Sequence, residues 1–248
     1  MAKYVLFDTE TTGNEDSDKI IQIGAMVIDG RGDTKVYDEL CGTKTPIKIE
    51  AMEVHNIVPE LIEGRPPFTE SSFYRDLLSL NSPDNYLIAH NINFDLGMLI
   101  SEGFKNRMQL IDTLRCSKHL YPNSPYHRLQ YFRYALELYK KEKEEAKKYN
   151  ITIKAHDAIG DVLVMKLLLS KLVEKIRLNY PNINPMKKLV ELTQQPVMLQ
   201  IFGFGKYKGE NIELIARKDM GYIRWMYKNM ELDEDMQFTL EHIMERYS

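Results

Sequence analysis

The chain has 248 residues, 44% of them hydrophobic, which suffices for one large domain or for a medium domain with a small second one. Its formal net charge of −3 excludes a protein that grips long duplexes over its whole surface, but not a local contact with a strand end. It lacks an apolar run of about 18 residues and does not begin like a signal peptide, so we expect neither a membrane span nor secretion. Cys41 and Cys116 lie far apart and indicate a reducing compartment, for which we predict the cytoplasm.

The first half of the chain predicts three strands and then an alternation of helices and strands. We expect strands at residues 5–7, 19–29, 34–40, 86–89 and 108–111, and helical segments at 51–55, 68–80, 93–103 and 112–120. Short connections make the first three strands antiparallel, and the later strands join through helices. This pattern favours an α/β fold with a mixed sheet that is flanked by helices.

The second half predicts mainly helices. Residues 130–149 predict one long helix with a charged, solvated second half, and residues 156–178 predict an amphipathic helix. The prolines after it predict a linker at 179–198. Residues 199–248 predict a small α+β accessory domain with a glycine-rich hairpin, so that residues 1–178 form the main domain.

Two carboxylates lie at the end of the first predicted strand. Asp8 and Glu10 are two positions apart, and side chains with this spacing point to the same face of a strand. Neighbouring carboxylates repel each other unless a cation lies between them. A strand end that simply reaches solvent is the alternative interpretation.

Two further segments carry acids at comparable places. Asp95 follows the fourth strand, where ligands bind in open α/β sheets, although it could also stabilise a helix N-terminus. His156 and Asp161 begin the amphipathic helix, and we assign Asp157 at most a capping role. Acids that converge in one cleft require divalent cations, and two Mg²⁺ ions suit in-line attack on a phosphodiester. His156 is then the natural general base, because imidazole titrates near neutral pH.

The segments "FDTETTG", "HNINFD" and "HDAIGD" resemble, in this order, the three motifs of the DEDDh (DnaQ-like) 3′-5′ exonuclease family, over about residues 3–178. The resemblance implies a ribonuclease H-like fold with a five-stranded mixed sheet. It also implies a two-metal 3′-5′ exonuclease that releases nucleoside 5′-monophosphates. By this resemblance Asp8, Glu10, Asp95 and Asp161 bind two Mg²⁺ or Mn²⁺ ions, and His156 is the catalytic base.

The same resemblance implies contacts with the substrate. Thr9 and Thr11 lie where family members contact the terminal nucleotide. His55, in "IEAMEVHNI", would lie beside that nucleotide, with a surface histidine in a turn as the alternative. Phe94 would stack on a base near the 3′ end, or be a core aromatic. Asn91 is expected to hold the loop that presents the acid of the second motif.

The tail resembles the C-terminal domain of exonuclease X-like proteins through "FGKYKG" and the Tyr-Ile-Arg-Trp helix that follows. Lys206, Tyr207 and Lys208 form a basic and aromatic tip suited to nucleic acid, with an ordinary polar turn as the alternative. We expect a DNA 3′ end as the substrate, in repair or proofreading, and a polymerase or repair complex as a partner. There are two alternatives: an enzyme that trims short RNA, and a non-catalytic module that binds nucleic acid beside a polymerase.

Overall fold

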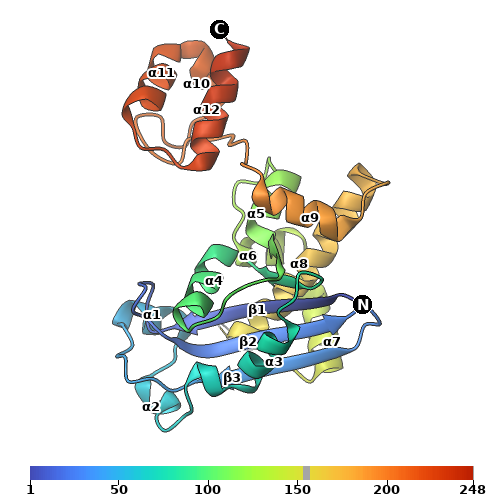
Figure 1. The fold of residues 1–248 in the computed structure, drawn as a ribbon. Coiled ribbons are helices and arrows are strands. Elements are labelled where there is room, and N and C mark those ends of the chain that lie inside the picture. Colours follow the sequence, from blue (N-terminus) through green and yellow to red (C-terminus); the bar gives the residue numbers. More distant parts are fainter. Residues whose placement is uncertain (153–156, 248) are drawn as a thin grey trace.

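The computed structural model describes residues 1–152 and 157–247, so His156 lies outside the described residues. A five-stranded mixed sheet with the order β3-β2-β1-β4-β5 forms the centre of the main domain (Figure 1). Its strands are β1 (Lys3–Thr11), β2 (Ile20–Asp29), β3 (Thr34–Leu40), β4 (Tyr86–Ala89) and β5 (Gln109–Asp112). The strands β1, β2 and β3 are antiparallel, whereas β4 runs parallel to β1 and to β5. The predicted sheet is therefore confirmed.

Helices cover both faces of this sheet. They are α1 (Ile49–His55), α2 (Pro59–Ile62), the 3-10 helix η1 (Phe68–Glu70), α3 (Ser72–Leu80), α4 (Ile92–Ser101), α5 (Thr113–Leu120), α6 (Leu129–Ala135), α7 (Tyr139–Tyr149), α8 (Ala158–Asn179) and α9 (Pro185–Gln194). Because side chains alternate along β1, Val5 and Phe7 pack into the core beneath α3 and α4, whereas Leu6 packs into the core beneath α8. The central strand is thus buried on both faces.

The long helix α8 packs closely against the sheet at Gly24. This glycine pairs with Asp8 across β1 and β2. A Cβ atom at this position would lie 2.3 Å from the backbone of both Ala158 and Ile159, at the start of α8. Glycine is therefore required here, and the close approach brings the first turn of α8 over the strand end that carries the first motif.

Residues 130–149, predicted as one helix, form α6 and α7 instead. The break lies at Glu137, whose φ of 53° is left-handed and cannot continue a right-handed helix. Arg133 of α6 and Glu142 of α7 then form an ion pair, with 2.6 Å between Arg133 Nε and Glu142 Oε1. Most of α7 is exposed, as its charge predicted, but Glu142 is buried.

Residues 179–198, predicted as a linker, contain the helix α9. The Asn184 side chain caps this helix, and Pro185 occupies its first turn, where the missing N–H costs nothing. Leu189 and Leu192 are buried in the core that also contains α8. The segment therefore packs as part of the sheet domain.

The tail has a core of its own. The helices α10 (Ile212–Lys218), α11 (Met220–Asn229) and α12 (Glu234–Arg246) pack around Phe202 and lie apart from the sheet (Figure 1). The predicted hairpin is a loop closed by one β-bridge between Ile201 and Asn211, and residues 199–247 contain no strand. The tail is thus helical rather than α+β. Asp235 attaches it to the sheet domain, because its Oδ1 lies 3.0 Å from Arg115 Nη2 and accepts a hydrogen bond from Val197 N.

Both cysteines are buried free thiols. Burial raises the pKa of Cys41 and of Cys116 to about 12, so neither is poised for reaction at neutral pH. In the described part of the chain, no helix is both long enough and apolar enough to cross a bilayer.

Candidate active site

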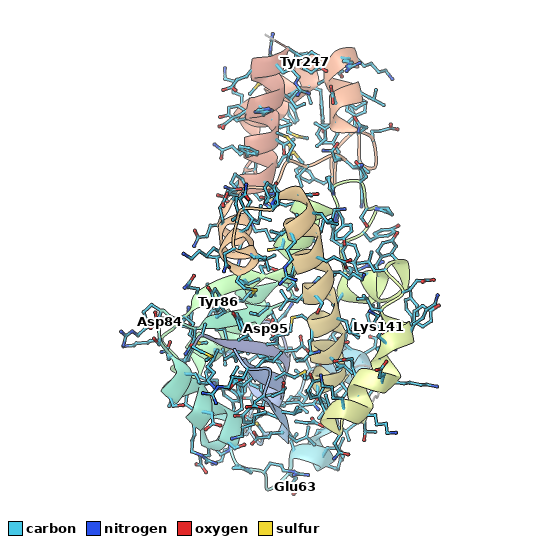
Figure 2. All side chains as sticks on the ribbon, turned by 90° about the vertical axis from the view of Figure 1, so that its right-hand side faces the viewer. Glu63, Asp84, Tyr86, Asp95, Lys141 and Tyr247 are labelled. Atoms are coloured by element: carbon cyan, nitrogen blue, oxygen red, sulfur yellow. The ribbon has the colours of Figure 1, made fainter. Side chains whose placement is uncertain are left out.

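Asp95 is fixed against the first strand. Its Oδ1 accepts a hydrogen bond from Thr9 N at 3.0 Å and another from Thr9 Oγ1 at 2.7 Å. Asp95 lies in the first turn of α4, beside the sheet in Figure 2, and both residues are buried. Because Thr9 separates Asp8 from Glu10, this contact joins the second motif to the first. The predicted contact of Thr9 with a nucleotide stays a prediction, since its hydroxyl and N–H are engaged by Asp95.

Asp161 lies in the first turn of α8 and is held by a network that the sequence did not reveal. Its Oδ1 accepts a hydrogen bond from Gln130 Nε2 at 2.6 Å. Gln130 Oε1 in turn accepts from Arg133, whose guanidinium also pairs with Glu142. Gln130 is 31 positions away from Asp161, and no local pattern marks it, so only the fold identifies its role.

The acids of the three motifs form one electrostatic group. Burial, and then the charges of Asp95, Asp161 and Glu10, raise the pKa of Asp8 well above its usual range. Burial, and then the charges of Asp161, Asp95 and Asp157, raise the pKa of Glu10 to about 8. Burial also raises the pKa of Asp95, against the effect of its hydrogen bonds. These carboxylates therefore destabilise one another when all are ionised.

This donor set fits a hard divalent cation in chemistry and charge. Carboxylate oxygens are the ligands that Mg²⁺ and Mn²⁺ prefer, and a cation would offset the mutual repulsion. Within residues 1–152 and 157–247, however, no three His, Cys, Asp or Glu side chains form a group that could hold a metal ion as they stand. Asp95 and Asp161 each direct one oxygen to Thr9 or Gln130. The structure thus couples the predicted ligands without gathering them into a coordination sphere.

Asp157 binds the sheet instead of capping a helix. It occupies the N-cap position of α8, but its side chain makes no capping hydrogen bond. Its Oδ1 accepts from Gln22 Nε2 at 2.7 Å, and the same Gln22 nitrogen donates to Asp38. Its Oδ2 is buried without a hydrogen-bond partner among the described residues. Gln22 pairs with Glu10, so this contact fixes the chain immediately after His156 beside the first motif.

His55 is buried rather than on the surface, so the surface-turn interpretation was wrong. Its Nδ1 accepts from Ile57 N at 2.9 Å, so Nε2 carries the proton and donates to Thr11 O at 3.2 Å. Burial lowers the pKa of His55 and keeps the ring neutral. The ring therefore stabilises the end of β1, and Asn56 after it has a positive φ of 58°. The contacts of His55 and Thr11 with a nucleotide stay predictions.

Phe94 and Asn91 flank the start of α4. The Phe94 side chain is 37% exposed and belongs to no described hydrophobic core, so the core interpretation was wrong. Asn91 adopts a left-handed conformation with a φ of 76°, and its side chain does not cap the helix. The loop is held by Asp112 instead, whose Oδ1 accepts from Asn91 N at 3.0 Å.

The predicted tip of the tail is partly engaged in internal contacts. Lys206 Nζ lies 3.2 Å from Asp219 Oδ2, and the Tyr207 hydroxyl donates to the same oxygen at 2.7 Å. Lys208 is exposed. Two of the three polar groups therefore already have an acidic partner.

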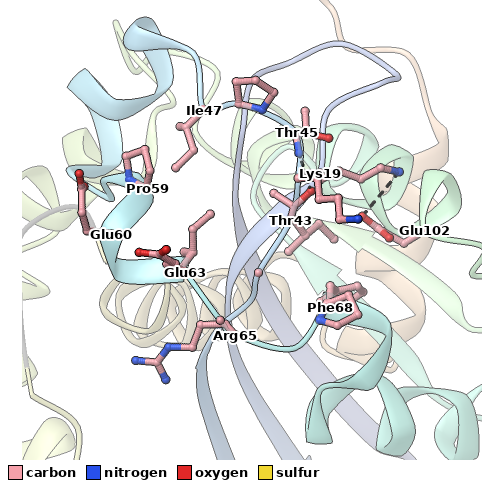
Figure 3. A pocket seen from close by; sticks show the side chains of 17 residues that line it. Lys19, Thr43, Thr45, Ile47, Pro59, Glu60, Glu63, Arg65, Phe68 and Glu102 are labelled. Carbon is pink, nitrogen blue, oxygen red and sulfur yellow. Dashed lines mark hydrogen bonds and ion pairs between the residues drawn. The ribbon is translucent and has the colours of Figure 1, made fainter.

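A separate pocket of about 850 Å³ lies between the start of β2, the helix α2 and η1 (Figure 3). Lys19 and Glu102 form an ion pair at its edge, and Ile47 and Phe68 contribute apolar surface. None of the predicted catalytic acids lines this pocket. This pocket is thus separate from the predicted acids.

Two family models match the chain. The family described as Exonuclease matches residues 5–169, and the family described as Exodeoxyribonuclease X-like C-terminal matches residues 202–231. Exodeoxyribonuclease 10 of Escherichia coli (strain K12) is 24% identical over 246 residues, which cover 97% of this chain and 98% of that protein. The PolC-type DNA polymerase III of Bacillus subtilis (strain 168) is 28% identical over 179 residues, which cover 69% of this chain and 11% of that protein.

A solved structure shares the fold. Exonuclease X in complex with 5′ overhanging duplex DNA matches with a TM-score of 0.54 and 18% sequence identity. The match covers 77% of this chain and 99% of that chain. At this identity the likeness concerns the fold, namely the mixed sheet and its flanking helices.

Proposed function

This chain belongs to the exonuclease family, whose model matches residues 5–169, and from this premise we propose that it removes nucleotides from the 3′ ends of DNA. The observation that carries the proposal is the electrostatic coupling of Asp8, Glu10, Asp95 and Asp161 at the end of β1. The substrate is a single-stranded or frayed end, and the products are nucleoside 5′-monophosphates. The names of two relatives, Exodeoxyribonuclease 10 and exonuclease X in complex with DNA, support DNA over RNA.

In the proposed mechanism, Asp8, Glu10, Asp95 and Asp161 would hold two divalent ions, Mg²⁺ or Mn²⁺. When bound, such ions would supply Lewis acidity for an attacking water and for the leaving 3′ oxygen. His156 would act as the general base that accepts a proton from the attacking water. Neighbouring residues hold these acids in position. Thr9 orients Asp95, and Gln130 orients Asp161, through hydrogen bonds. The close packing at Gly24 fixes the distance between α8 and the strand.

The terminal nucleotide is proposed to bind beside these acids. Thr9, Thr11 and His55 shape the end of β1, and Phe94 offers an exposed ring at the start of α4 for stacking on a base. Asn91 lies just before that helix, and its exposed side chain is free of capping contacts. With these proposed contacts, the scissile phosphate would lie near the second motif.

We further propose two functional units. The exonuclease unit comprises residues 1–178 and is extended by α9, because α9 shares its core. Residues 199–248 form the accessory unit. We place the enzyme in the cytoplasm, in DNA repair or replication, and propose a polymerase or repair complex as its partner. The relationship to a PolC-type polymerase supports this last step.

The test is a gel assay with 5′-labelled single strands of DNA and RNA of matched sequence. We expect DNA to shorten from the 3′ end in Mg²⁺ or Mn²⁺, but not in EDTA or with Asp8→Ala. Asp84→Ala, which removes an exposed acid far from the first motif, is the matched control and should retain full activity. Faster shortening of RNA would overturn the DNA preference, and cleavage of neither strand would overturn the proposed function.

A further inference from the structure

The tail exposes the single tryptophan of the chain. Trp225 lies on α11, and its side chain is 52% exposed. It stacks on Tyr222, with 6.0 Å between the ring centroids and 26° between the ring planes. Because the exposed indole is stacked on a second ring, the two side chains form one aromatic surface rather than a single exposed side chain.

Cations surround this ring. At 3.6 residues per turn, Arg224 and Lys228 share the solvent face of α11 with Trp225, and both are exposed. Neither forms an ion pair within the described residues. From the preceding loop, Lys206 Nζ lies 5.8 Å from the centroid of the Tyr222 ring. Among the residues that the structure describes, Arg224 and Lys228 thus supply unpaired positive charge beside the aromatic pair, whereas the charge of Lys206 is offset by Asp219.

The surface is built around Asp219. Its Oδ1 accepts from Tyr222 N at 3.0 Å at the start of α11, and its Oδ2 binds Lys206 and Tyr207. The Tyr222 hydroxyl accepts from Lys206 N at 3.1 Å. A Cβ on Gly205 would lie 2.5 Å from that hydroxyl, so glycine is required there, and its φ of 78° permits the turn. These contacts hold the rings in place before any partner binds.

We name this surface the Trp225 platform, and its members are Lys206, Tyr222, Arg224, Trp225 and Lys228. We propose that the platform binds single-stranded DNA on the 5′ side of the nucleotide that is being hydrolysed. A base stacks on the exposed indole, and backbone phosphates lie at the cations. Aromatic faces combined with positive charge bind single strands without regard to sequence. The inference rests on the proposed function, because the bound strand is the substrate of the active site.

The sequence predicted a nucleic-acid contact at residues 206–208, whereas we now propose that the main contact lies on α11. The polar ends of Lys206 and Tyr207 are directed to Asp219, so two of the three polar groups at the tip already have a partner. An acidic peptide would meet the same cations. A single strand fits better, because the near-parallel rings of Tyr222 and Trp225 offer a flat face that continues a stack of bases.

Tryptophan fluorescence tests the platform directly, because all indole emission comes from Trp225. The full-length protein with Mg²⁺ is titrated with oligothymidylates of increasing length, protected at the 3′ end by phosphorothioate linkages. We expect long strands to quench the emission and a dinucleotide to leave it unchanged. If the enzyme cleaves DNA but no DNA alters its emission, the inference about the platform is overturned, while the proposed function stands. Quenching by an acidic peptide but not by DNA would instead assign the platform to a protein partner.

Variants give a second test that does not depend on the indole signal. Trp225→Ala should weaken binding of long single strands by about 5- to 100-fold, while hydrolysis of a dinucleotide stays unchanged. Leu214→Ala is the matched control, because Leu214 is 62% exposed on α10 of the same unit and should affect neither. Trp225→Phe should restore most of the binding, which excludes misfolding as the cause.

Charge reversal completes the design. Arg224→Glu combined with Lys228→Glu should weaken long-strand binding and make it less dependent on salt, because phosphate contacts release counterions. Unchanged long-strand binding in both the Trp225→Ala and the charge variants would overturn the inference. An equal loss on the dinucleotide would overturn it as well, because the tail would then act on the active site. If the wild type cleaves no DNA, the proposed function fails, while the titration still decides the platform.

Discussion

In the sheet domain the important polar groups are buried or half-buried and held from distant parts of the chain, whereas in the tail they are half-buried or exposed and held locally. Two of the proposed catalytic acids, Asp95 and Asp161, accept hydrogen bonds from residues 86 and 31 positions away. The groups around Asp219 all come from within 13 positions. The active site therefore depends on the whole fold, and the tail surface depends on one loop and one helix.

The contrast extends to charge. The acids of the sheet domain repel one another and gain from a cation, whereas the cations beside Trp225 gain from a polyanion. The proposed single-stranded DNA substrate, with its divalent ions, would satisfy both regions. Substitutions in the sheet domain should therefore affect chemistry or folding, and substitutions in the tail should affect strand binding alone. The predictions that follow test this division.

The largest effect is expected from the acids that are proposed to bind metal. Asp8→Ala and Asp161→Ala should each abolish cleavage, because each removes an oxygen ligand, and should keep the fold. Cleavage rates, circular dichroism and thermal unfolding check this. Each variant should unfold at a higher temperature than the wild type in EDTA, because it relieves the repulsion among the remaining acids. Near wild-type cleavage by either variant would remove that acid from the site.

His156→Ala should lower the cleavage rate by about 10²–10⁴-fold, the usual loss for a general base. Its affinity for Mg²⁺ should change little, because the histidine is not proposed as a ligand. Single-turnover kinetics and metal titration separate these two quantities. His242→Ala, which removes an exposed histidine of the tail, is the control. An unchanged rate in the first variant would exclude His156 as the base.

Gly24→Ala should lower the free energy of unfolding by about 3 kcal/mol, because the new methyl group overlaps the backbone of α8. Gly97→Ala is the matched control. A Cβ at Gly97 meets no atom within 4 Å, so alanine in this helix should stabilise the protein by about 0.5–1 kcal/mol. Chemical denaturation measures both values, and equal stability of the two variants would contradict the packing argument.

Gln130→Leu should lower the cleavage rate by about 10–100-fold, as is typical for a residue that orients a metal ligand. Higher Mg²⁺ concentrations should recover part of the loss, because Asp161 remains present but less well placed. Gln237→Leu, at an exposed glutamine of α12, should have no effect. A loss that Mg²⁺ does not alter would indicate a purely structural role.

Much of the sheet domain could be predicted from the sequence because its signals are local. The strands at 34–40 and 86–89 have the predicted bounds. Asp95 and Asp161 lie in the first turns of α4 and α8, whereas Asp8 and Glu10 lie within β1, which extends four residues beyond the predicted end at Phe7. The acids themselves were identified as candidates from these patterns together with the family resemblance. The alternation of hydrophobic and polar residues, and the ends of strands, can be recognised from neighbouring residues without knowledge of distant contacts.

The parts that escaped prediction depend on tertiary contacts. Glu137 carries no glycine or proline signal, yet it breaks a helix, and the pairing of Arg133 with Glu142 accompanies the turn. Proline indicated a linker, but Pro185 suits a first helical turn, and the burial of Leu189 stabilises α9. Gln130 could not be found, because its partner lies on another helix.

The smallest effect concerns pH in the absence of metal. The pKa of Glu10 is raised from 4.5 to about 8 in the folded state, so the folded protein binds more protons than the unfolded chain between these values. In EDTA the free energy of unfolding should therefore fall as pH rises from about 5 to about 8, by a screened amount on the order of 1 kcal/mol. Mg²⁺ or Glu10→Gln should flatten this slope, whereas Glu53→Gln, at an exposed position on α1, should not. An unchanged slope in Glu10→Gln would contradict the role of Glu10 in the repelling group and would assign the pH dependence to Asp8 and Asp95, whose pKa values are also raised.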